Sequence, residues 1–402
     1  MDFEEMEMDR QAKNQSYLRK KNKKDIIWLL RDMSRSYSDI ARVLKLSNTA
    51  VAKIADDLIA DNLICRESDT KGRNGIMLRI NSDYGYIFAA DLSGRTIKIC
   101  AADMSGKIIL RHTISDVVSF RRSDFDRMID QMKEMMHTPQ LNGKKLCCIG
   151  LATPGKLNES GEFLLNPRFK GFGNMSVKEE LRKAFGCEVV VKNDVNLAME
   201  GEKAYGSLKE VSNALMLHID VGTGSAFMLD GKVYVGCHGF AGEIGYFRLN
   251  MFSASPDNYD NLYYSNYFDS LSLFSALSIL QRETAYGNEG YLSEYAKEKG
   301  ISCSEIPIEA ILEAYRAGDA LTQKVLNSSA KVIATVANNL CELLDIDTIV
   351  FNGAVTELGQ RYLDEIVPYT GNRNVQFSSL MENAALMGAL NAGLTQFFES
   401  SL

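Results

Sequence analysis

Three features are missing from this sequence of 402 residues. No apolar run reaches the roughly 18–20 residues that a helix needs to span a bilayer. The first ten residues, MDFEEMEMDR, are acidic and contain no apolar signal core, so secretion is not expected. The eight cysteines are scattered, and no pair has metal-ligand spacing. We therefore expect a cytoplasmic protein with reduced thiols, mostly buried, and with no membrane partner.

The charge is distributed unevenly along the chain. The net charge is −7, but residues 1–82 carry 16 Lys/Arg against 13 Asp/Glu, and the remaining residues carry 29 against 39. Five of the first thirteen acids lie within the first nine residues, so residues 10–82 are strongly basic. A basic module before an acidic body indicates an N-terminal segment that meets a polyanion, although a solvated basic face gives the same signal.

The first eighty residues have the pattern of a helix-turn-helix. Apolar spacing predicts a helix over 24–33, a short helix over 38–44 capped by Ser38, and a longer helix over 48–63 capped by Ser47. Only three residues separate the last two helices. The predicted apolar face of the longer helix consists of Val51, Ile54, Leu58 and Leu63. This arrangement is typical of DNA-binding modules, but helical hairpins without DNA are also common.

Two predicted strands, 63–65 and 76–80, follow around the loop 68–75 and complete a winged helix over residues 1–82. The start of the longer helix would face the major groove, and the wing tip would lie near the backbone or minor groove. The predicted DNA contacts are Ser47, Asn48, Thr49, Lys53, Lys71 and Arg73. The basic cluster 19–24 adds phosphate-binding capacity, or is only a solvated helix start.

The body of the chain predicts a two-lobed α/β fold. Residues 83–205 read as strands 86–91, 96–104, 107–113 and 145–151 with helices 125–136 and 177–185, which make a first lobe. Residues 206–402 read as a second lobe, with strands 214–221, 225–229, 232–235 and 348–353 and helices over 266–345. The final helix, 383–394, is the element that can return to the first lobe. Two such lobes around a cleft suit an actin-like, sugar-kinase-type (ribonuclease H-like) architecture.

The stretch CEVVVKNDVNLAME (187–200) lies where a ligand is expected. Its β-branched run ends in Asn193 and Asp194, and a helix-forming run follows. This places an amide and a carboxylate at the carboxyl end of a buried strand, the usual ligand crevice of an α/β sheet. Both residue types are also good helix caps, so a purely structural role is the alternative.

Taken together, the motifs resemble the ROK family of repressors, open reading frames and sugar kinases. The resemblance covers nearly the whole chain and rests on the order of five motifs after the winged helix. They are DLSGRTIKICAADMSG (91–106), ATPGKL (152–157), KNDVN (192–196), a glycine-punctuated hairpin (220–236) and GFAGEIGYF (239–247).

The phosphate side of the family's nucleotide site is altered. Family kinases begin with Asp-Leu-Gly-Gly-Thr, whereas this chain has Ser93 and Arg95 at the third and fifth positions. A Cβ at Ser93 hinders close approach of backbone to phosphate. When the hairpin is aligned on Asp230-Gly231, Asp220 stands at the first glycine of the second phosphate turn; when GTG (222–224) is matched directly instead, the hairpin is shorter than the family's and the later glycines are missing. The late Gly-Gly turn, which holds adenosine in the kinases, reads NGA (352–354). The resemblance therefore implies a chain that does not use ATP.

The sugar side is better kept. The resemblance assigns effector contacts to Gly155, Asn166, Asn193, Asp194 and Glu243, and in the family's kinases the matching Asp is the catalytic base. A carboxylate and an amide suit sugar hydroxyls even without chemistry. An ordinary surface or ion-paired acid is the alternative for Glu243.

The family's structural zinc site is lost from the sequence. Tyr246 replaces the ligand His, and no Cys occurs between Cys237 and Cys303. We expect no metal and no cofactor, and we count Tyr246 among the effector contacts. The aromatic segment 250–268 fills the place of the zinc loop, as packing or as part of a pocket lid.

These features predict a sugar-responsive transcriptional regulator, a repressor of carbohydrate genes, in which a degenerate kinase fold senses the effector. It would bind double-stranded operator DNA as a homodimer or a dimer of dimers. Two alternatives remain at this point. One is an ATP-dependent sugar kinase that carries a DNA-binding module, with Asp194 as catalytic base. The other is a ligand-independent DNA-binding protein whose body only dimerises.

Overall fold

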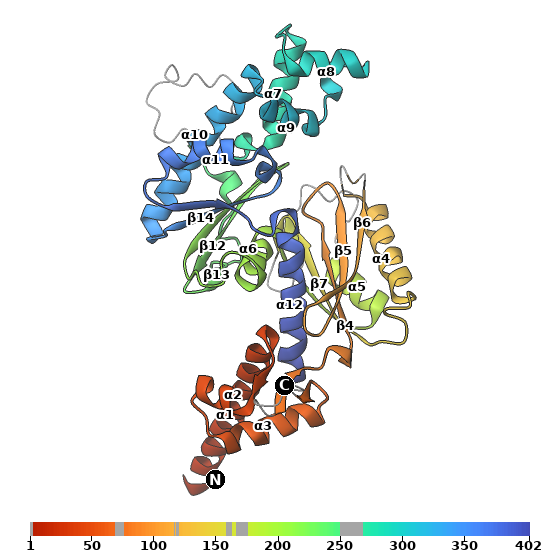
Figure 1. Cartoon of the computed structure of the whole chain (residues 1–402), viewed down its shortest axis with the longest axis vertical. Coiled ribbons are helices and arrows are strands. Elements are labelled where there is room, and N and C mark those ends of the chain that lie inside the picture. The colour runs from red at the N-terminus through yellow and green to blue at the C-terminus, as the bar shows by residue number, and fades with distance from the viewer. Residues whose placement is uncertain are drawn as a thin grey trace.

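The computed structural model describes residues 3–68, 76–115, 117, 120–157, 163–165, 176–249 and 268–402. Figure 1 shows a small N-terminal module at one end of the molecule and two α/β lobes at the other, with helix α12 (Ala384–Ser401) running between them. The predicted fold class, a winged helix-turn-helix joined to a two-lobed body, is confirmed. None of the described helices is long and apolar enough to cross a membrane.

The N-terminal module is a winged helix. Its elements are α1 (Phe3–Asp32), β1 (Arg35–Ser36), α2 (Tyr37–Leu44), α3 (Asn48–Ala60), β2 (Ile64–Ser68) and β3 (Ile76–Ile80), and the strands form a sheet in the order β1-β3-β2. The predicted apolar face, Val51, Ile54, Leu58 and Leu63, is buried, although α3 ends at Ala60 and not at residue 63 as predicted. Helix α1 begins far before residue 24, the predicted start. Its first part is charged and carries no apolar stripe, so the sequence pattern did not predict it.

The caps explain the tight turn between α2 and α3. Lys45 ends α2 in the left-handed region with φ 55°, and the Ser47 hydroxyl accepts the Ala50 amide at 3.1 Å, as predicted. The prediction of Ser38 as the cap of α2 is wrong. Ser36 caps that helix by accepting the Asp39 amide at 3.1 Å, and Ser38 lies inside the first turn.

The first lobe is a five-stranded sheet in the order β10-β7-β4-β5-β6. Its strands are β4 (Tyr86–Asp91), β5 (Ile97–Asp103), β6 (Ile108–Ile114), β7 (Leu146–Thr153) and β10 (Glu188–Asn193). The lobe also contains the helices α4 (Arg122–Met136) and α5 (Val177–Phe185), and β8 (Lys156–Leu157) and β9 (Phe163–Leu165) form a short hairpin. Strands β7 and β10 pair in parallel with Thr153 opposite Asn193, so their carboxyl ends meet at one edge.

The second lobe is a five-stranded sheet in the order β13-β12-β11-β14-β15, covered by helices. Its strands are β11 (Ala214–Ile219), β12 (Thr223–Leu229), β13 (Lys232–Tyr234), β14 (Thr348–Asn352) and β15 (Asn374–Phe377). The helices are α7 (Leu273–Ala285), α8 (Tyr291–Lys299), α9 (Ile308–Ala317), α10 (Ala320–Leu344) and α11 (Gln360–Ile366). Short 3-10 turns include η2 (Ile244–Tyr246), η5 (Phe268–Leu271), η6 (Cys303–Glu305), η7 (Ala354–Leu358), η8 (Val367–Tyr369) and η9 (Met381–Asn383). Strand β15 has only four residues and was not predicted.

Helix α12 packs between the first-lobe sheet and α6 (Asp194–Tyr205), because glycines let the backbones touch. A Cβ at Gly388 would overlap the backbone of Leu197, and one at Gly150 would overlap the backbone of Ala389. The last helix of the chain is therefore part of the first lobe's core.

The eight cysteines are all free thiols. Cys100, Cys147, Cys148 and Cys341 are buried, whereas Cys237 is exposed.

Candidate functional site: a cleft between the lobes

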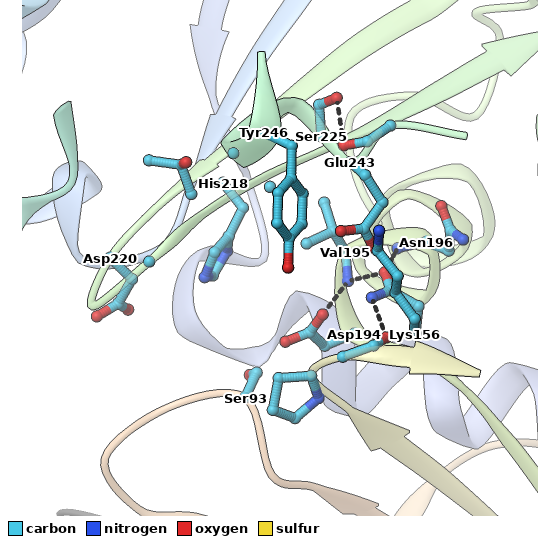
Figure 2. A pocket seen from close by; sticks show the side chains of 18 of the residues that line it. Ser93, Lys156, Asp194, Val195, Asn196, His218, Asp220, Ser225, Glu243 and Tyr246 are labelled. Atoms are coloured by element: carbon cyan, nitrogen blue, oxygen red, sulfur yellow. Dashed lines mark hydrogen bonds between the residues drawn. The ribbon is translucent and has the colours of Figure 1, made fainter. Parts of the chain in front are cut away.

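A cavity of about 380 Å³ lies between the two lobes. The first lobe contributes the segments 154–156 and 193–196 together with Ser93, and the second contributes 218–225 and 239–246. This volume lies within the range of small-molecule sites. Figure 2 shows side chains from both lobes pointing into the same space.

Asn193 and Asp194 lie at the junction of β10 and α6. The Asn193 side-chain oxygen accepts the amides of Val195 (3.0 Å) and Asn196 (3.1 Å) and so caps α6. Its nitrogen donates to the Gly155 carbonyl at 3.4 Å, which ties the cap to the neighbouring loop. The structural role considered for this pair is thus real for Asn193, which also lines the cavity.

Asp194 is the first residue of α6 and is only 7% exposed. One carboxylate oxygen accepts the Val195 amide at 2.9 Å. The side chain faces the cavity, opposite the second lobe (Figure 2). A buried carboxylate held this firmly is suited to accept hydrogen bonds from a polyhydroxylated ligand.

Glu243 approaches the cavity from the second lobe. Its loop is fixed to β12, because Ser225 donates both its amide (3.0 Å) and its hydroxyl (2.9 Å) to the Gly242 carbonyl. Gly242 has φ +87°, and a Cβ there would overlap Ser225, so the turn requires glycine. Burial raises the pKa of Glu243; the positive charge of Lys156 opposes this, and the negative charge of Asp194 adds to it.

Tyr246 lies across the cavity and places its phenol among these groups (Figure 2). The Lys156 ammonium lies 4.3 Å from the centre of the Tyr246 ring and 5.3 Å from that of Phe240. These cation–π contacts join the two lobes across the cleft. Lys156 was not predicted as a site residue, although it directly follows Gly155 in the ATPGKL motif.

The phosphate side is occupied by the protein's own groups. One oxygen of the Asp220 carboxylate accepts the Val221 amide at 2.8 Å, and the other accepts the Ala354 amide at 3.1 Å. These amides begin the turn before β12 and the 3-10 turn η7, the two segments that the resemblance matches to the kinases' second phosphate turn and adenosine turn. Asp220 therefore joins the two turns at the edge of the cavity and satisfies both amides with its own carboxylate.

In the first phosphate turn, Asp91 and Ser93 hydrogen-bond to each other. The Asp91 carboxylate accepts both the amide (2.9 Å) and the hydroxyl (2.6 Å) of Ser93. Burial raises the pKa of Asp91, and the two Ser93 hydrogen bonds act against it. Arg95 leaves this turn and forms an ion pair with Glu309 on α9, in the other lobe.

The residues present do not fit the family's zinc ion. Tyr246 offers a phenol inside the cleft where the motif has an imidazole, and within the described parts of the chain no group of three or more His, Cys, Asp or Glu is placed to hold a metal.

The predicted DNA-contacting residues of α3 lie together on its exposed start. Ser47, Asn48, Thr49 and Lys53 are all exposed. The basic cluster before them is partly used internally, because Arg19 pairs with Asp57. Lys23 likewise pairs with Asp61, which directly follows α3, and Lys24 pairs with Glu399 on α12.

Three predicted site residues, Asn166, Lys71 and Arg73, lie outside the described residues, as does the aromatic segment 250–267.

A winged helix joined to two lobes around a sugar-kinase-type cleft defines a class of chain that combines DNA binding with small-molecule recognition. Residues 87–391 match the ROK family, and the chain belongs to it.

The chain is similar both to proteins named as repressors and to proteins named as kinases. The chain is 24% identical over 375 residues to a xylose repressor of Caldicellulosiruptor bescii, covering 88% of this chain and 90% of that protein. It is 27% identical over 271 residues to a β-glucoside kinase of Listeria innocua, covering 67% of this chain and 83% of the kinase. Among solved structures, a ROK family transcriptional regulator described as a homologue of the E. coli Mlc protein aligns with a TM-score of 0.76 and 20% identity, over 96% of this chain and 98% of that one. A Streptomyces griseus ROK glucokinase in complex with glucose and AMPPNP aligns with a TM-score of 0.63 over 77% of this chain and the whole of the kinase, at 20% identity.

Proposed function

We propose that this chain is a sugar-responsive transcriptional repressor that binds operator DNA as a homodimer and does not transfer phosphate. The observation that carries the proposal is a winged helix and a kinase-type cleft in one chain, with Asp220 occupying the amides of the phosphate side. Sugar bound at Asp194 and Glu243 changes the angle between the lobes and thereby the placement of the DNA-binding modules. A protein that works on DNA in this way acts in the cytoplasm.

Several features support the repressor role. The exposed start of α3 presents hydroxyl, amide and ammonium groups, which suit base edges and phosphates. The relatives named xylose repressors make D-xylose the first effector to test. Glu243, Asp194 and Asn193 offer acceptors and a donor for sugar hydroxyls.

DNA binding is tested with the full chain. A duplex selected from a random library is labelled, and anisotropy is measured at several salt concentrations with and without a panel of sugars that includes D-xylose. Binding should weaken strongly with salt, and one sugar should change the affinity. The triple variant Asn48→Ala, Thr49→Ala, Lys53→Ala should lose at least about tenfold in affinity. Lys144→Ala removes an equal charge from an exposed site on the first lobe and should bind like the wild type. Equal binding by the triple variant would count against this interface.

The kinase alternative is tested by ADP release in the presence of ATP and the same sugars. Because the phosphate side is already occupied, we expect no sugar-dependent turnover. Turnover that disappears in Asp194→Asn would establish a kinase and overturn this part of the proposal.

A further inference from the structure

We propose that Arg31 is the positioning residue through which the sugar cleft controls the DNA-binding module. The inference rests on the proposed repressor function. It assigns a contact at the base of the body, distant from both the cleft and the exposed start of α3, as the place where the two are coupled.

Arg31 lies in the last turn of α1 and contacts both helices that connect the lobes. Its guanidinium donates to the Asn391 side-chain oxygen on α12 at 2.8 Å and to the Tyr205 hydroxyl at the end of α6 at 3.2 Å. The same group lies 4.5 Å from the centre of the Trp28 ring, one turn earlier on α1. Arg31 therefore joins the module to α6 and α12 through a planar group with several fixed donors.

Helix α6 connects this contact to the cleft. It begins at Asp194, which faces the cavity, and ends at Tyr205, which receives the Arg31 hydrogen bond. A helix of 12 residues is about 18 Å long and moves as one rigid element. Gly201 and Gly388 bring α6 into backbone contact with α12, so a shift of one helix carries the other.

The two connections between the lobes meet beside this contact. Glu202, one turn before Tyr205, is fully buried and receives hydrogen bonds from both connections between the lobes. Its carboxylate accepts the amide (2.8 Å) and hydroxyl (3.0 Å) of Ser207 from the first connection. From the second connection it accepts the hydroxyls of Ser378 (2.6 Å) and Ser379 (2.8 Å) and the amide of Leu380 (2.8 Å).

These hydrogen bonds favour the ionised form of the Glu202 carboxylate. Burial raises the pKa of Glu202, but the hydrogen bonds from Ser378, Leu380, Ser207 and Ser379 outweigh burial and hold it below its usual range. Glu202 therefore ties both connections between the lobes to α6, and Arg31 contacts the end of α6 and the middle of α12 beside it. A ligand that turns the lobes shifts α6 through these hydrogen bonds, and Arg31 passes that shift to α1 and the winged helix.

The test separates coupling from binding. DNA affinity of the full chain is measured by anisotropy with and without the panel sugar that acts most strongly on the wild type. Arg31→Ala should still bind the duplex, but the sugar effect should fall from the about 5- to 150-fold range of allosteric coupling to less than about twofold. Tyr205→Phe removes only the hydroxyl, and with it one of the two hydrogen bonds of Arg31, and should reduce the sugar effect on DNA affinity in part. Sugar affinity, measured by calorimetry without DNA, should remain within about threefold in both variants.

Lys24→Ala is the matched control. It removes the more exposed Lys24–Glu399 ion pair between the same two helices, α1 and α12, and should keep the full sugar effect. A wild-type sugar effect in Arg31→Ala and Tyr205→Phe would overturn the inference and leave the proposed function intact. If no sugar changes the wild-type affinity, the proposed function itself fails, and the inference fails with it. Loss of the effect in Lys24→Ala as well would also overturn it, because any damage to the interface would then suffice.

Discussion

The two sides of the cleft use their polar groups in opposite ways. On the sugar side, Asn193 caps the helix, while Asp194 and Glu243 face the cavity from opposite lobes. On the phosphate side, both oxygens of Asp220 accept backbone amides, and Arg95 pairs with Glu309 across the lobes. A ligand can therefore be recognised on the first side, whereas the second side holds the protein's own structure together.

The largest effect that would test this contrast is expected at Asp194. Asp194→Asn keeps the shape of the side chain but removes a charged acceptor, so sugar affinity should fall by about 10- to 100-fold. Isothermal titration calorimetry with the most active sugar measures this. Asp130→Asn, on the exposed side of α4, serves as control and should bind normally. Unchanged binding in Asp194→Asn would remove this residue from the effector site.

Asp220 should show the reverse behaviour. Asp220→Asn keeps one acceptor oxygen and puts an NH2 group at the other position, so one of the Val221 and Ala354 amides loses its acceptor, which should cost about 1–3 kcal/mol of the free energy of unfolding. Sugar affinity should stay within about threefold, because this group is committed to the backbone. Urea denaturation and calorimetry on the same sample decide the matter. A variant of normal stability that has lost sugar binding would show that Asp220 contacts the ligand.

The raised pKa of Glu243 predicts a pH dependence on the sugar side. Burial, with Asp194 adding to it and Lys156 opposing, means that Glu243 takes up a proton at a higher pH than a free glutamate. Sugar hydroxyls bind the ionised carboxylate, so affinity should fall as the pH drops through this raised pKa, by at most about tenfold per pH unit. Binding titrations from neutral to acidic pH measure the slope. In Glu243→Gln this component should disappear; an identical slope there would assign it to another group.

The smallest effect is expected at Arg95. Its ion pair with Glu309 is exposed, and such pairs contribute about 0–1 kcal/mol. Arg95→Ala should therefore change the free energy of unfolding and the sugar affinity only slightly. If Arg95→Ala has a normal free energy of unfolding in urea but has lost much of its sugar affinity, this ion pair instead sets the lobe angle that the ligand needs.

Much of the fold was predictable because its signals are local. Helix α5 was predicted with the observed limits because Gly186 marks its end; that Ser176 caps its start was not predicted. The cap at Ser47 was correct, but Ser36 and Ser38 lie too close for a pattern to choose between them. At the cleft, the sequence located Asp194 and the altered turns, and it treated Asp220 as negative charge near a phosphate. That the carboxylate accepts the Ala354 amide, 134 residues away, depends on the packing of β11 beside β14 and lies beyond any local pattern. The same holds for Arg31 and Arg95, whose partners lie far along the chain.

Helix α12 has a consequence for how the molecule is made. Its residues 384–401 complete the core of a lobe whose first strand lies some three hundred residues earlier in the chain. Gly150 of β7 packs against α12, and Gly388 of α12 packs against α6, so these contacts form only after α12 has been made. During synthesis from the N-terminus, the apolar sheet face that α12 covers stays exposed until the second lobe has been translated. The two lobes are thus expected to reach the native state in one late, shared step, after α12 has been made.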